Sequence, residues 1–342
     1  MSSFVVLLFL STCAWSSGVV ATSGFLSVGD WGSAALGGFH QRNAADTAAA
    51  MKAFIDRTTA TPRNGQDTPL FILSTGDNFY YCGIRNTSDP QITEDYSSLF
   101  GGMEIPWYQS LGNHDYGFSP EAQLALNETI PGWIMDGRYY HRRVEFTPSI
   151  VANIIVLDTN PCIRDYRGDD RRRWDPCGTE YPDCSPIAEP CRFHENIIAQ
   201  DCNTQLAWVK ETLNNITKST SSREWVFVVG HHKADEINVA DFQTTILDDP
   251  RVHLYLNGHT HNLEHYEING QAKYMTTGAG GMVVIGAAVS AHADATSTTK
   301  SIWSKVVTGF TSHTFINNGT TMRTDFWDVK KNESIYSFEV DV

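Results

Sequence analysis

Five apolar segments of the chain end in the same way, each in a glycine followed by polar residues. They span residues 25–30, 70–77, 107–114, 225–231 and 252–261. Apolar runs of this length predict buried strands, and the amphipathic stretches 43–57, 93–100, 204–215 and 239–247 predict helices. Because strand and helix alternate along much of the chain, the pattern favours an α/β fold with a βαβ-built sheet.

Other segments break this alternation. Residues 138–146 with 153–159, and 310–315 with 322–327, have the pattern of hairpins, and residues 273–277 predict a further strand. Residues 160–202 have little apolar periodicity but hold five cysteines, so we expect a surface insertion tied by disulfides. Zinc bound by these cysteines is the alternative, although no Cys-x-x-Cys pair is present. We predict a single domain over residues 22–342.

The first 21 residues are apolar and end in small residues, which is typical of a secretory signal peptide. Its removal would take away Cys13 and leave six of the seven cysteines, an even number that favours disulfides in an exported protein. We therefore expect a secreted glycoprotein, or one of a lysosome- or vacuole-like compartment. Five glycosylation sequons fit this route: Asn86, Asn127, Asn215, Asn318 and Asn332.

The charge and the remaining apolar content narrow the possible partners. The 342 residues carry a formal net charge of −14, which argues against binding to nucleic acid or to an anionic membrane surface. No second apolar run of about 18 residues follows the first, so we expect no membrane span. A Gly-x-Ser-x-Gly elbow is absent from the sequence, which argues against a serine hydrolase.

Metal-type ligands follow all five of the glycine-ended strands. In α/β sheets, ligands collect beyond the carboxyl ends of the strands, and residues two apart, such as His259 and His261, point to the same side of an extended chain. Carboxylates and a phenolate suit a hard ion such as Fe(III), whereas imidazoles and an amide suit a divalent ion. The sequence therefore predicts a dinuclear metal site. Its candidate ligands are Asp30, Asp77, Tyr80, Asn113, His231, His259 and His261.

The motifs at these strand ends resemble those of a known family. Gly-Asp-Trp-Gly, Gly-Asp-Asn-Phe-Tyr, Gly-Asn-His-Asp, Gly-His-His and Gly-His-Thr-His begin at residues 29, 76, 112, 230 and 258. In this order they resemble the metallophosphoesterases, and Tyr80 points to the small, tartrate-resistant type of purple acid phosphatase. The resemblance runs from about residue 24 to the C-terminus, apart from the cysteine-rich insertion. It implies a β-sandwich of two mixed sheets flanked by helices, with the metal site at the C-terminal strand ends.

The resemblance also implies a role for each ligand. Asp30, Asp77, Tyr80 and His261 would hold Fe(III). Asp77 would bridge to a divalent ion (Zn, Fe or Mn) held by Asn113, His231 and His259. A metal-bound hydroxide would attack a phosphate monoester while His114 binds the phosphate and protonates the leaving group.

The chain departs from the family pattern at two places. Thr260 stands between the last two histidines, where the small phosphatases often carry Asp. After His231 the family usually places a second, substrate-facing histidine, but residues 233–240 contain none. His232 is our candidate for that substrate contact, with Lys233 as the alternative.

We therefore expect a secreted acid phosphatase that acts on small-molecule or protein phosphate esters. A phosphodiesterase or nucleotide pyrophosphatase on the same scaffold is the enzymatic alternative, because of the altered stretch after His231. A surface or scaffold protein that has lost turnover is the non-enzymatic alternative.

Overall fold

Two seven-stranded mixed sheets, flanked by helices, form the body of the protein. The computed structural model describes residues 24–60, 69–168, 176–177, 191–216, 222–283 and 299–342. The strand orders are β14-β13-β12-β1-β2-β3-β4 in the first sheet and β11-β9-β10-β8-β7-β6-β5 in the second. The predicted fold, two mixed sheets with helices at their sides, is confirmed. The predicted signal peptide, residues 1–21, lies outside the described residues.

The first sheet combines a parallel half with an antiparallel half. Strands β1 to β4 run parallel, and β12, β13 and β14 add to them as an antiparallel meander beside β1. The strand bounds are β1 (Gly24–Val28), β2 (Pro69–Ser74), β3 (Trp107–Tyr108), β4 (Trp133–Ile134), β12 (Gly309–Ile316), β13 (Thr321–Asp328) and β14 (Glu333–Asp341).

The second sheet has a parallel centre and antiparallel edges. Strands β6, β7, β8 and β10 run parallel, whereas β5, β9 and β11 pair antiparallel with their neighbours. The strand bounds are β5 (Tyr140–Thr147), β6 (Ile150–Val156), β7 (Arg223–Val229), β8 (Leu254–Asn257), β9 (Leu263–Ile268), β10 (Gln271–Thr277) and β11 (Lys300–Lys305).

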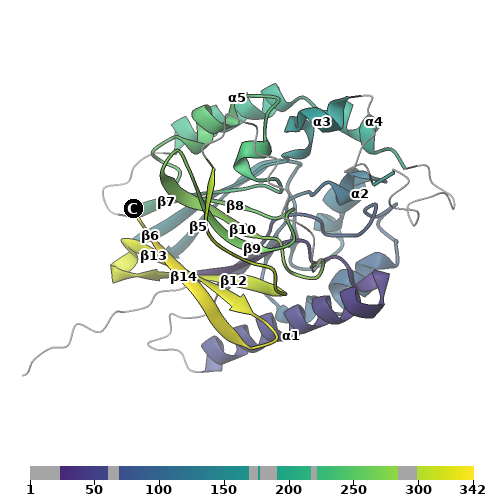
Figure 1. Cartoon of the computed structure of the whole chain (residues 1–342), viewed down its shortest axis with the longest axis horizontal. Helices are drawn as coiled ribbons and strands as arrows, with labels where there is room; N and C mark the ends of the chain where they lie inside the picture. The colour runs from purple at the N-terminus through teal and green to yellow at the C-terminus, as the bar shows by residue number, and fades with distance from the viewer. Residues whose placement is uncertain (1–23, 61–68, 169–175, 178–190, 217–221, 284–298) are drawn as a thin grey trace, which may run out of the picture.

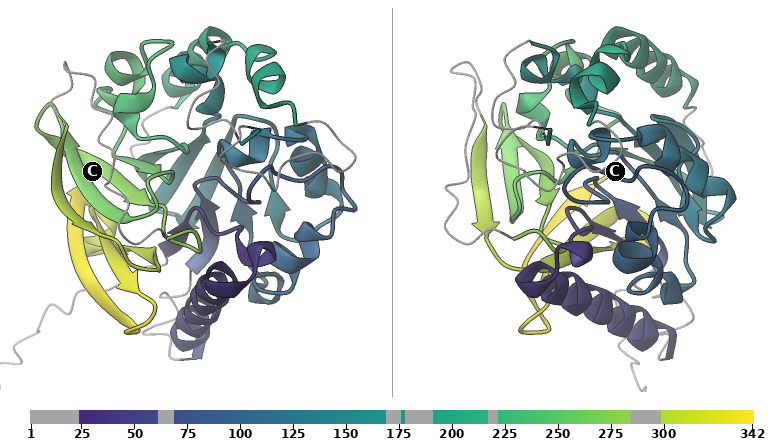
Figure 2. Two further views of the ribbon diagram at one scale, coloured as in Figure 1. Left: turned by 45° about the vertical axis from the view of Figure 1, so that its right-hand side comes forward. Right: turned by 90° about the vertical axis from the view of Figure 1, so that its right-hand side faces the viewer.

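The helices lie on opposite sides of the paired sheets. The long α1 (Gly38–Ala60) runs along one side, and α3 (Arg164–Arg167), α4 (Phe193–Ile198) and α5 (Cys202–Asn215) cover the other (Figure 1). The short α2 (Pro120–Ala125) follows the end of β3, and the turned views keep both sheets between these helical layers (Figure 2). None of the described helices is both long and apolar enough to cross a membrane.

Buried aromatic side chains fill the space between the two sheets. The ring of Phe25 on β1 lies 5.2 Å from that of Phe227 on β7, and the ring of Phe146 on β5 lies 4.7 Å from that of Phe315 on β12. These contacts join strands of different sheets, so burial of aromatic surface holds the sandwich together. With the sheets packed in this way, the carboxyl ends of the parallel strands of both sheets lie at one edge, where His231 after β7 bonds to Thr75 after β2.

Some predicted elements are shorter than the pattern suggested. The helix predicted over residues 239–247 is reduced to one turn, Gln243–Leu247. The N–H of Thr244 donates to Asp241 Oδ1 at 3.2 Å, so Asp241 caps the turn and the helix begins only after it. The predicted third strand covers only Trp107–Tyr108. Strands β9, β11 and β14 were not predicted, because polar residues interrupt their apolar pattern.

Two disulfides tie the described part of the cysteine-rich insertion. Cys162 pairs with Cys202, which joins the two ends of the segment, and Cys177 pairs with Cys191. Cys82 is also disulfide-bonded. The predicted use of cysteines for disulfides is therefore confirmed for these residues.

Candidate metal centre

The structure brings all seven predicted ligands together at the carboxyl edge of the two sheets. The loops after β1, β2 and β3 of the first sheet supply oxygen atoms, and the loops after β7 and β8 of the second sheet supply imidazoles. Asp30, Asp77 and His231 are completely buried. A cluster of buried carboxylates and imidazoles at the meeting point of two sheets is stable only with compensating charge.

One group of ligands gathers around the phenol of Tyr80. Its Oη donates to Asp30 Oδ1 and to Asp77 Oδ2, both at 2.9 Å, and lies 3.2 Å from His261 Nε2. His261 Nε2 is 3.3 Å from Asp30 Oδ1. These four side chains therefore present three oxygens and one nitrogen to a single point.

A second group gathers around the amide oxygen of Asn113. His231 Nε2 lies 2.9 Å and His259 Nδ1 lies 3.1 Å from Asn113 Oδ1, and the two ring nitrogens are 3.2 Å apart. Asp77 Oδ2, which belongs to the Tyr80 group, is 3.4 Å from His231 Nε2. Asp77 thus lies between the two groups, as a bridging carboxylate must.

Hydrogen bonds behind the ligands set their orientation. His231 Nδ1 lies 2.8 Å from the carbonyl of Thr75, which can only accept, so Nδ1 carries the proton and the lone pair of Nε2 faces Asn113. The carboxylate of Asp115 accepts from the N–H groups of Asn78 at 3.0 Å and Gly112 at 2.8 Å. It thereby joins the loops that carry Asp77 and Asn113.

Four of the seven ligands adopt left-handed backbone conformations. The φ angles are 56° for Asp30, 54° for Asp77, 75° for His259 and 55° for His261. Such angles are uncommon outside glycine and cost about 1–3 kcal/mol each when the surrounding structure enforces them. Strain of this kind clusters at functional sites, which supports a ligand-binding role for this edge.

Glycines allow the loops to approach one another. A Cβ on Gly112 would lie 2.1 Å from Asp77 Oδ1, and one on Gly258 would lie 2.5 Å from Asp30 Oδ2. The motif glycines at these two positions are therefore explained by the space that the carboxylates occupy.

The electrostatics of the cluster favour a bound cation. Burial lowers the pKa of His231, but the carboxylates of Asp77 and Asp30 raise it to about 9. Burial raises the pKa of Asp77, whereas His231, His114 and His259 bring it well below its usual value. Burial and the same two carboxylates raise the pKa of Tyr80 well above that of a free phenol. The pocket thus holds positive charge between its acidic groups even without an ion.

The donor set fits two metal ions. Asn113 Oδ1 and the Nε2 of a neutral His231, with its proton on Nδ1, can both offer lone pairs to a cation, which would take the place of the Nε2 proton that the ion-free imidazolium carries. The Tyr80 group offers the harder oxygen ligands and the Asn113 group the softer imidazoles, which matches the division expected from the sequence.

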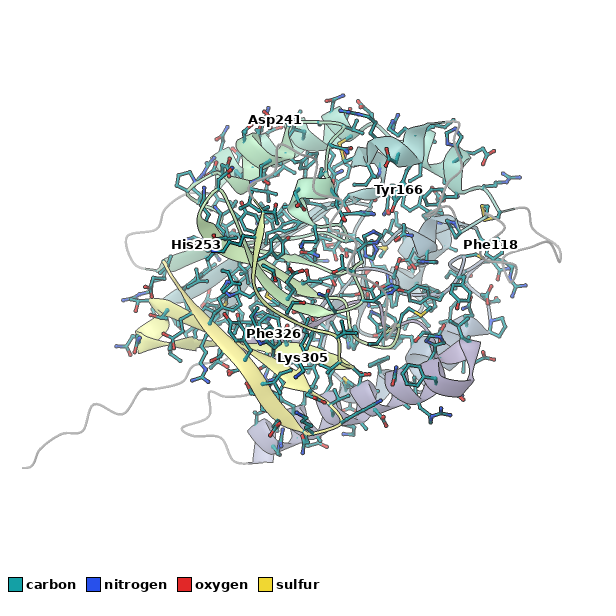
Figure 3. The ribbon with its side chains drawn as sticks, in the orientation of Figure 1. Phe118, Tyr166, Asp241, His253, Lys305 and Phe326 are labelled. Atoms are coloured by element: carbon teal, nitrogen blue, oxygen red, sulfur yellow. A yellow bond between two sulfur atoms is a disulfide. The ribbon has the colours of Figure 1, made fainter. Side chains whose placement is uncertain are left out.

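His114 and His232, the predicted substrate residues, lie beside the ligands. His114 Nδ1 donates to the carbonyl of Tyr81 at 2.7 Å, and its ring centre is 4.5 Å from that of Tyr80. Burial lowers the pKa of His114. His232 is buried, with Nδ1 2.8 Å from Thr159 Oγ1 and Nε2 2.8 Å from the hydroxyl of Tyr166, which is labelled in Figure 3. Both nitrogens of His232 are therefore engaged within the protein.

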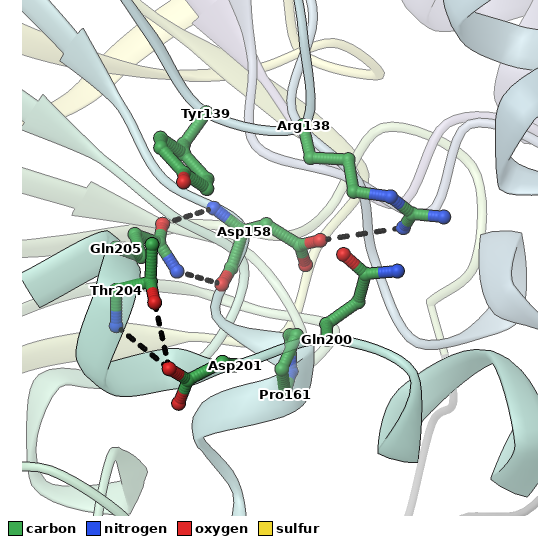
Figure 4. A pocket seen from close by; sticks show the side chains of 8 residues that line it. All are labelled: Arg138, Tyr139, Asp158, Pro161, Gln200, Asp201, Thr204 and Gln205. Atoms are coloured by element: carbon green, nitrogen blue, oxygen red, sulfur yellow. Dashed lines mark hydrogen bonds and ion pairs between the residues drawn. The ribbon is translucent and has the colours of Figure 1, made fainter. Parts of the chain in front are cut away.

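A sixth strand end, which the sequence analysis did not include, supports the site. After β6, Thr159 Oγ1 accepts from the backbone N–H groups of His231 at 3.3 Å and His232 at 3.2 Å. Its neighbour Asp158 lines a cavity of about 150 Å³ and pairs with Arg138 at 3.6 Å (Figure 4). The signal was present in the sequence, because residues 154–157 are an apolar run followed by polar residues, but no glycine marked its end.

The fold is that of a metallophosphoesterase, with buried Asp and His clusters where the two mixed sheets meet. The family model of the calcineurin-like phosphoesterases matches residues 25–263, and the chain belongs to this family. The family implies a dinuclear metal site, and the buried Asp and His clusters are present.

Curated relatives narrow the comparison to acid phosphatases. The chain is 29% identical to purple acid phosphatase 7 of Arabidopsis thaliana, over 75% of this chain and 69% of that protein. It is 28% identical to tartrate-resistant acid phosphatase type 5 of Oryctolagus cuniculus, over 82% of this chain and 80% of the relative. The resemblance to the small purple acid phosphatases is therefore confirmed.

Two solved structures share the fold. One is GAP50, described as the anchor in the inner membrane complex of Plasmodium, with a TM-score of 0.63, 24% identity, and coverage of 94% of this chain and 90% of that one. The other is purple acid phosphatase PPD1 from yellow lupin (Lupinus luteus) seeds, with a TM-score of 0.57 and 13% identity. The match covers 95% of this chain and 54% of that one. At these identities the likeness concerns the fold alone.

Proposed function

We propose that the protein is a secreted acid phosphatase that hydrolyses phosphate monoesters at a dinuclear centre of Fe(III) and a divalent ion. The observation that carries this proposal is the convergence of Asp30, Asp77 and His231, with the other four ligands, at interatomic distances of 2.9–3.4 Å. The acid phosphatase relatives support the choice of substrate class.

Each group of side chains has a role in this proposal. Asp30, Asp77, Tyr80 and His261 hold Fe(III), and Asn113, His231 and His259 hold zinc, iron or manganese together with the bridging Asp77. When bound, the two ions neutralise the charge of the phosphate group and lower the pKa of water. The deep burial of the carboxylates excludes bulk solvent from the ligands themselves.

His114 acts on the leaving group. Its Nδ1 donates to the carbonyl of Tyr81, which fixes the ring, so the proton for the departing alkoxide would come from Nε2 of the imidazolium form. His232 is packed between Thr159 and Tyr166, so it fixes the backbone beside His231; its direct contact with substrate stays a prediction.

The disulfides and the acid phosphatase relatives support a route through the secretory pathway. An extracellular or acidic vesicular compartment would suit such an enzyme, because Fe(III), if bound, would acidify a water ligand more strongly than a divalent ion.

Hydrolysis of p-nitrophenyl phosphate between pH 4 and 8 tests the proposal on secreted protein, with metal content measured in parallel. We expect an acid optimum, insensitivity to tartrate, and two ions per chain. Replacement of His114 by Asn should lower kcat by about 10²–10⁴-fold with both ions retained. His141→Asn, on β5 and outside this cluster, is the control. Faster hydrolysis of bis(p-nitrophenyl) phosphate than of the monoester would favour a phosphodiesterase.

A second candidate, a non-enzymatic anchor, is favoured by the fold shared with GAP50, whose description is that of an anchor. All seven ligands remain in place in this chain, which supports the enzyme instead. Protein that carries both ions but turns over neither ester would decide for the anchor.

A further inference from the structure

We propose that Asn215 carries an N-linked glycan whose first sugar, N-acetylglucosamine, is seated in a groove between the end of α5 and strands β5, β6 and β7. The inference goes beyond the proposed activity and depends only on passage through the secretory pathway. Asn215 is the last residue of α5 and opens the sequon Asn215-Ile216-Thr217.

The groove has the size and the lining of a ligand site. Its volume is about 460 Å³, within the range of about 300–1,000 Å³ that is usual for small-ligand sites. The asparagine that would carry the glycan is part of the wall, so a sugar joined to its Nδ2 starts at the groove. The lining from the sheet includes Arg143, Asn153 and Glu224, and the lining from the end of α5 includes Thr212, Asn215 and Ile216.

Polar groups of the sheet form a hydrogen-bonded row along the groove. Asn153 Nδ2 donates to Glu224 Oε2 at 2.9 Å, and Arg143 Nη2 pairs with Glu224 Oε1 at 3.2 Å. Among the described residues this ion pair engages one of the five N–H groups that a guanidinium carries, which leaves donors for the hydroxyls and the acetamido carbonyl of the sugar. Ile216 is half-buried and offers an apolar surface to the acetyl methyl group. The groove thus combines apolar contact with a few fixed polar groups.

The end of α5 is held in place by the segment before β8. Arg251 donates from Nη1 to the carbonyl of Leu213 at 2.5 Å and from Nη2 to Asn214 Oδ1 at 3.3 Å. Asn215 is exposed, and the backbone leaves the helix directly after it, because Ile216 is extended at φ −71° and ψ 102°. The attachment point is therefore both accessible and fixed. A fixed attachment point lowers the entropy that is lost when the sugar settles in the groove.

Three variants of the full-length secreted protein separate the glycan from the side chain that carries it. Thr217→Ala abolishes the sequon and keeps Asn215, whereas Thr217→Ser keeps the sequon and is the matched control. Arg143→Ala removes the proposed contact with the sugar, and it should fold because the Arg143 side chain is 52% exposed.

Two measurements follow the glycan on protein from cells that attach high-mannose glycans. Mass spectrometry gives the occupancy of each sequon and the rate at which peptide N-glycosidase F releases each glycan from the folded protein, since release converts Asn to Asp. Asn332, exposed in the turn between β13 and β14, is the reference site. Thermal unfolding is then measured after endoglycosidase H, which leaves a single N-acetylglucosamine on each occupied asparagine.

We expect Asn215 to be occupied and its glycan to be released about tenfold more slowly than that of Asn332, which is the effect of one or two hydrogen bonds. Arg143→Ala should reduce this difference. After trimming, T217A should unfold about 2 °C below T217S.

Four results would each overturn the inference: an unoccupied Asn215, equal release at Asn215 and Asn332, slow release that R143A leaves unchanged, or equal unfolding temperatures of T217A and T217S. Hydrolysis of phosphate esters enters none of these measurements. The glycan site and the proposed activity can therefore fail independently of each other.

Discussion

The two sheets contribute to the centre in different ways. Every candidate ligand from the first sheet binds through oxygen, in the carboxylates of Asp30 and Asp77, the phenol of Tyr80 and the amide of Asn113. The ligands from the second sheet are imidazoles: His231, His259 and His261. Each ion in the proposed centre takes ligands from both sheets, so the site exists only where the sandwich is closed.

This division of ligand types explains how the carboxyl edge of the two sheets could hold two different ions. The first sheet gives three oxygen ligands to one group and the second sheet gives two imidazoles to the other, with Asp77 between them. In the proposed centre, the harder oxygen ligands would favour one ion and the imidazoles the other, within a single domain. Replacement of a ligand that serves only one group should therefore weaken the binding of one ion more than that of the other. Asp77 is the exception, because it belongs to both groups.

The largest expected effect is at the bridge. Asp77→Ala should remove both ions and lower kcat by about 1,000-fold or more, because the carboxylate serves both groups and several kcal/mol of charge stabilisation go with it. His259→Ala should remove only the divalent ion. Elemental analysis of metal per chain checks both variants, with the exposed Asp56→Ala as the control. Loss of both ions in H259A would show that the two sheets do not divide the ions as described.

The next effect concerns the loop of the first sheet. Gly112→Ala would place a Cβ 2.1 Å from Asp77 Oδ1, so the bridge must shift. We expect the free energy of unfolding to fall by about 1–3 kcal/mol and the metal content to fall with it. Denaturant titration of the wild-type protein and the variant measures the first, and elemental analysis measures the second. Gly102→Ala, where nothing lies within 4 Å of the added Cβ, is the matched control. Equal metal content and stability in the two variants would contradict the packing argument.

A corresponding change on the second sheet alters a residue that holds the loop of His231 in place and is not itself a candidate ligand. Thr159→Val removes the oxygen that accepts from the backbone N–H groups of His231 and His232, and with it the hydroxyl that bonds to His232 Nδ1. Affinity for the divalent ion should fall about 10–100-fold, with Fe(III) retained. Metal titration followed by calorimetry measures this, with the exposed Thr93→Val as the control. A larger loss of Fe(III) than of the divalent ion would contradict this prediction.

The smallest effect is on stability alone. Two carboxyl groups outside the centre, those of the buried Asp95 and the half-buried Glu236, have pKa values that burial raises to about 7. The folded protein keeps these protons while the unfolded chain releases them, so the free energy of unfolding should fall as pH rises from about 4 to about 7 and then level off. Asp95→Asn and Glu236→Gln should each flatten the curve of unfolding free energy against pH; an unchanged slope would exclude that group.

Much of the fold followed from local pattern, and the exceptions have local causes. The strands that end in glycine were predictable because they are continuous apolar runs, as in β2 and β7. Strand β9 was not, because Glu264 is buried beside Lys233 and gives the strand a polar sequence inside the protein. The helix predicted over residues 239–247 begins later than its pattern suggests, because the carboxylate of Asp241 accepts from the N–H of Thr244 and caps the turn there.

The sequence by itself determined the seven candidate ligands and their order, because each stands at a fixed offset from a glycine at the end of an apolar run. Only the tertiary structure decided which atoms face one another. It placed Asp77 between the two groups, and it fixed the His231 ring through the carbonyl of Thr75. Spacing along a strand is a local property, whereas the closing of two sheets on each other depends on aromatic contacts between residues about two hundred positions apart, such as Phe25 and Phe227.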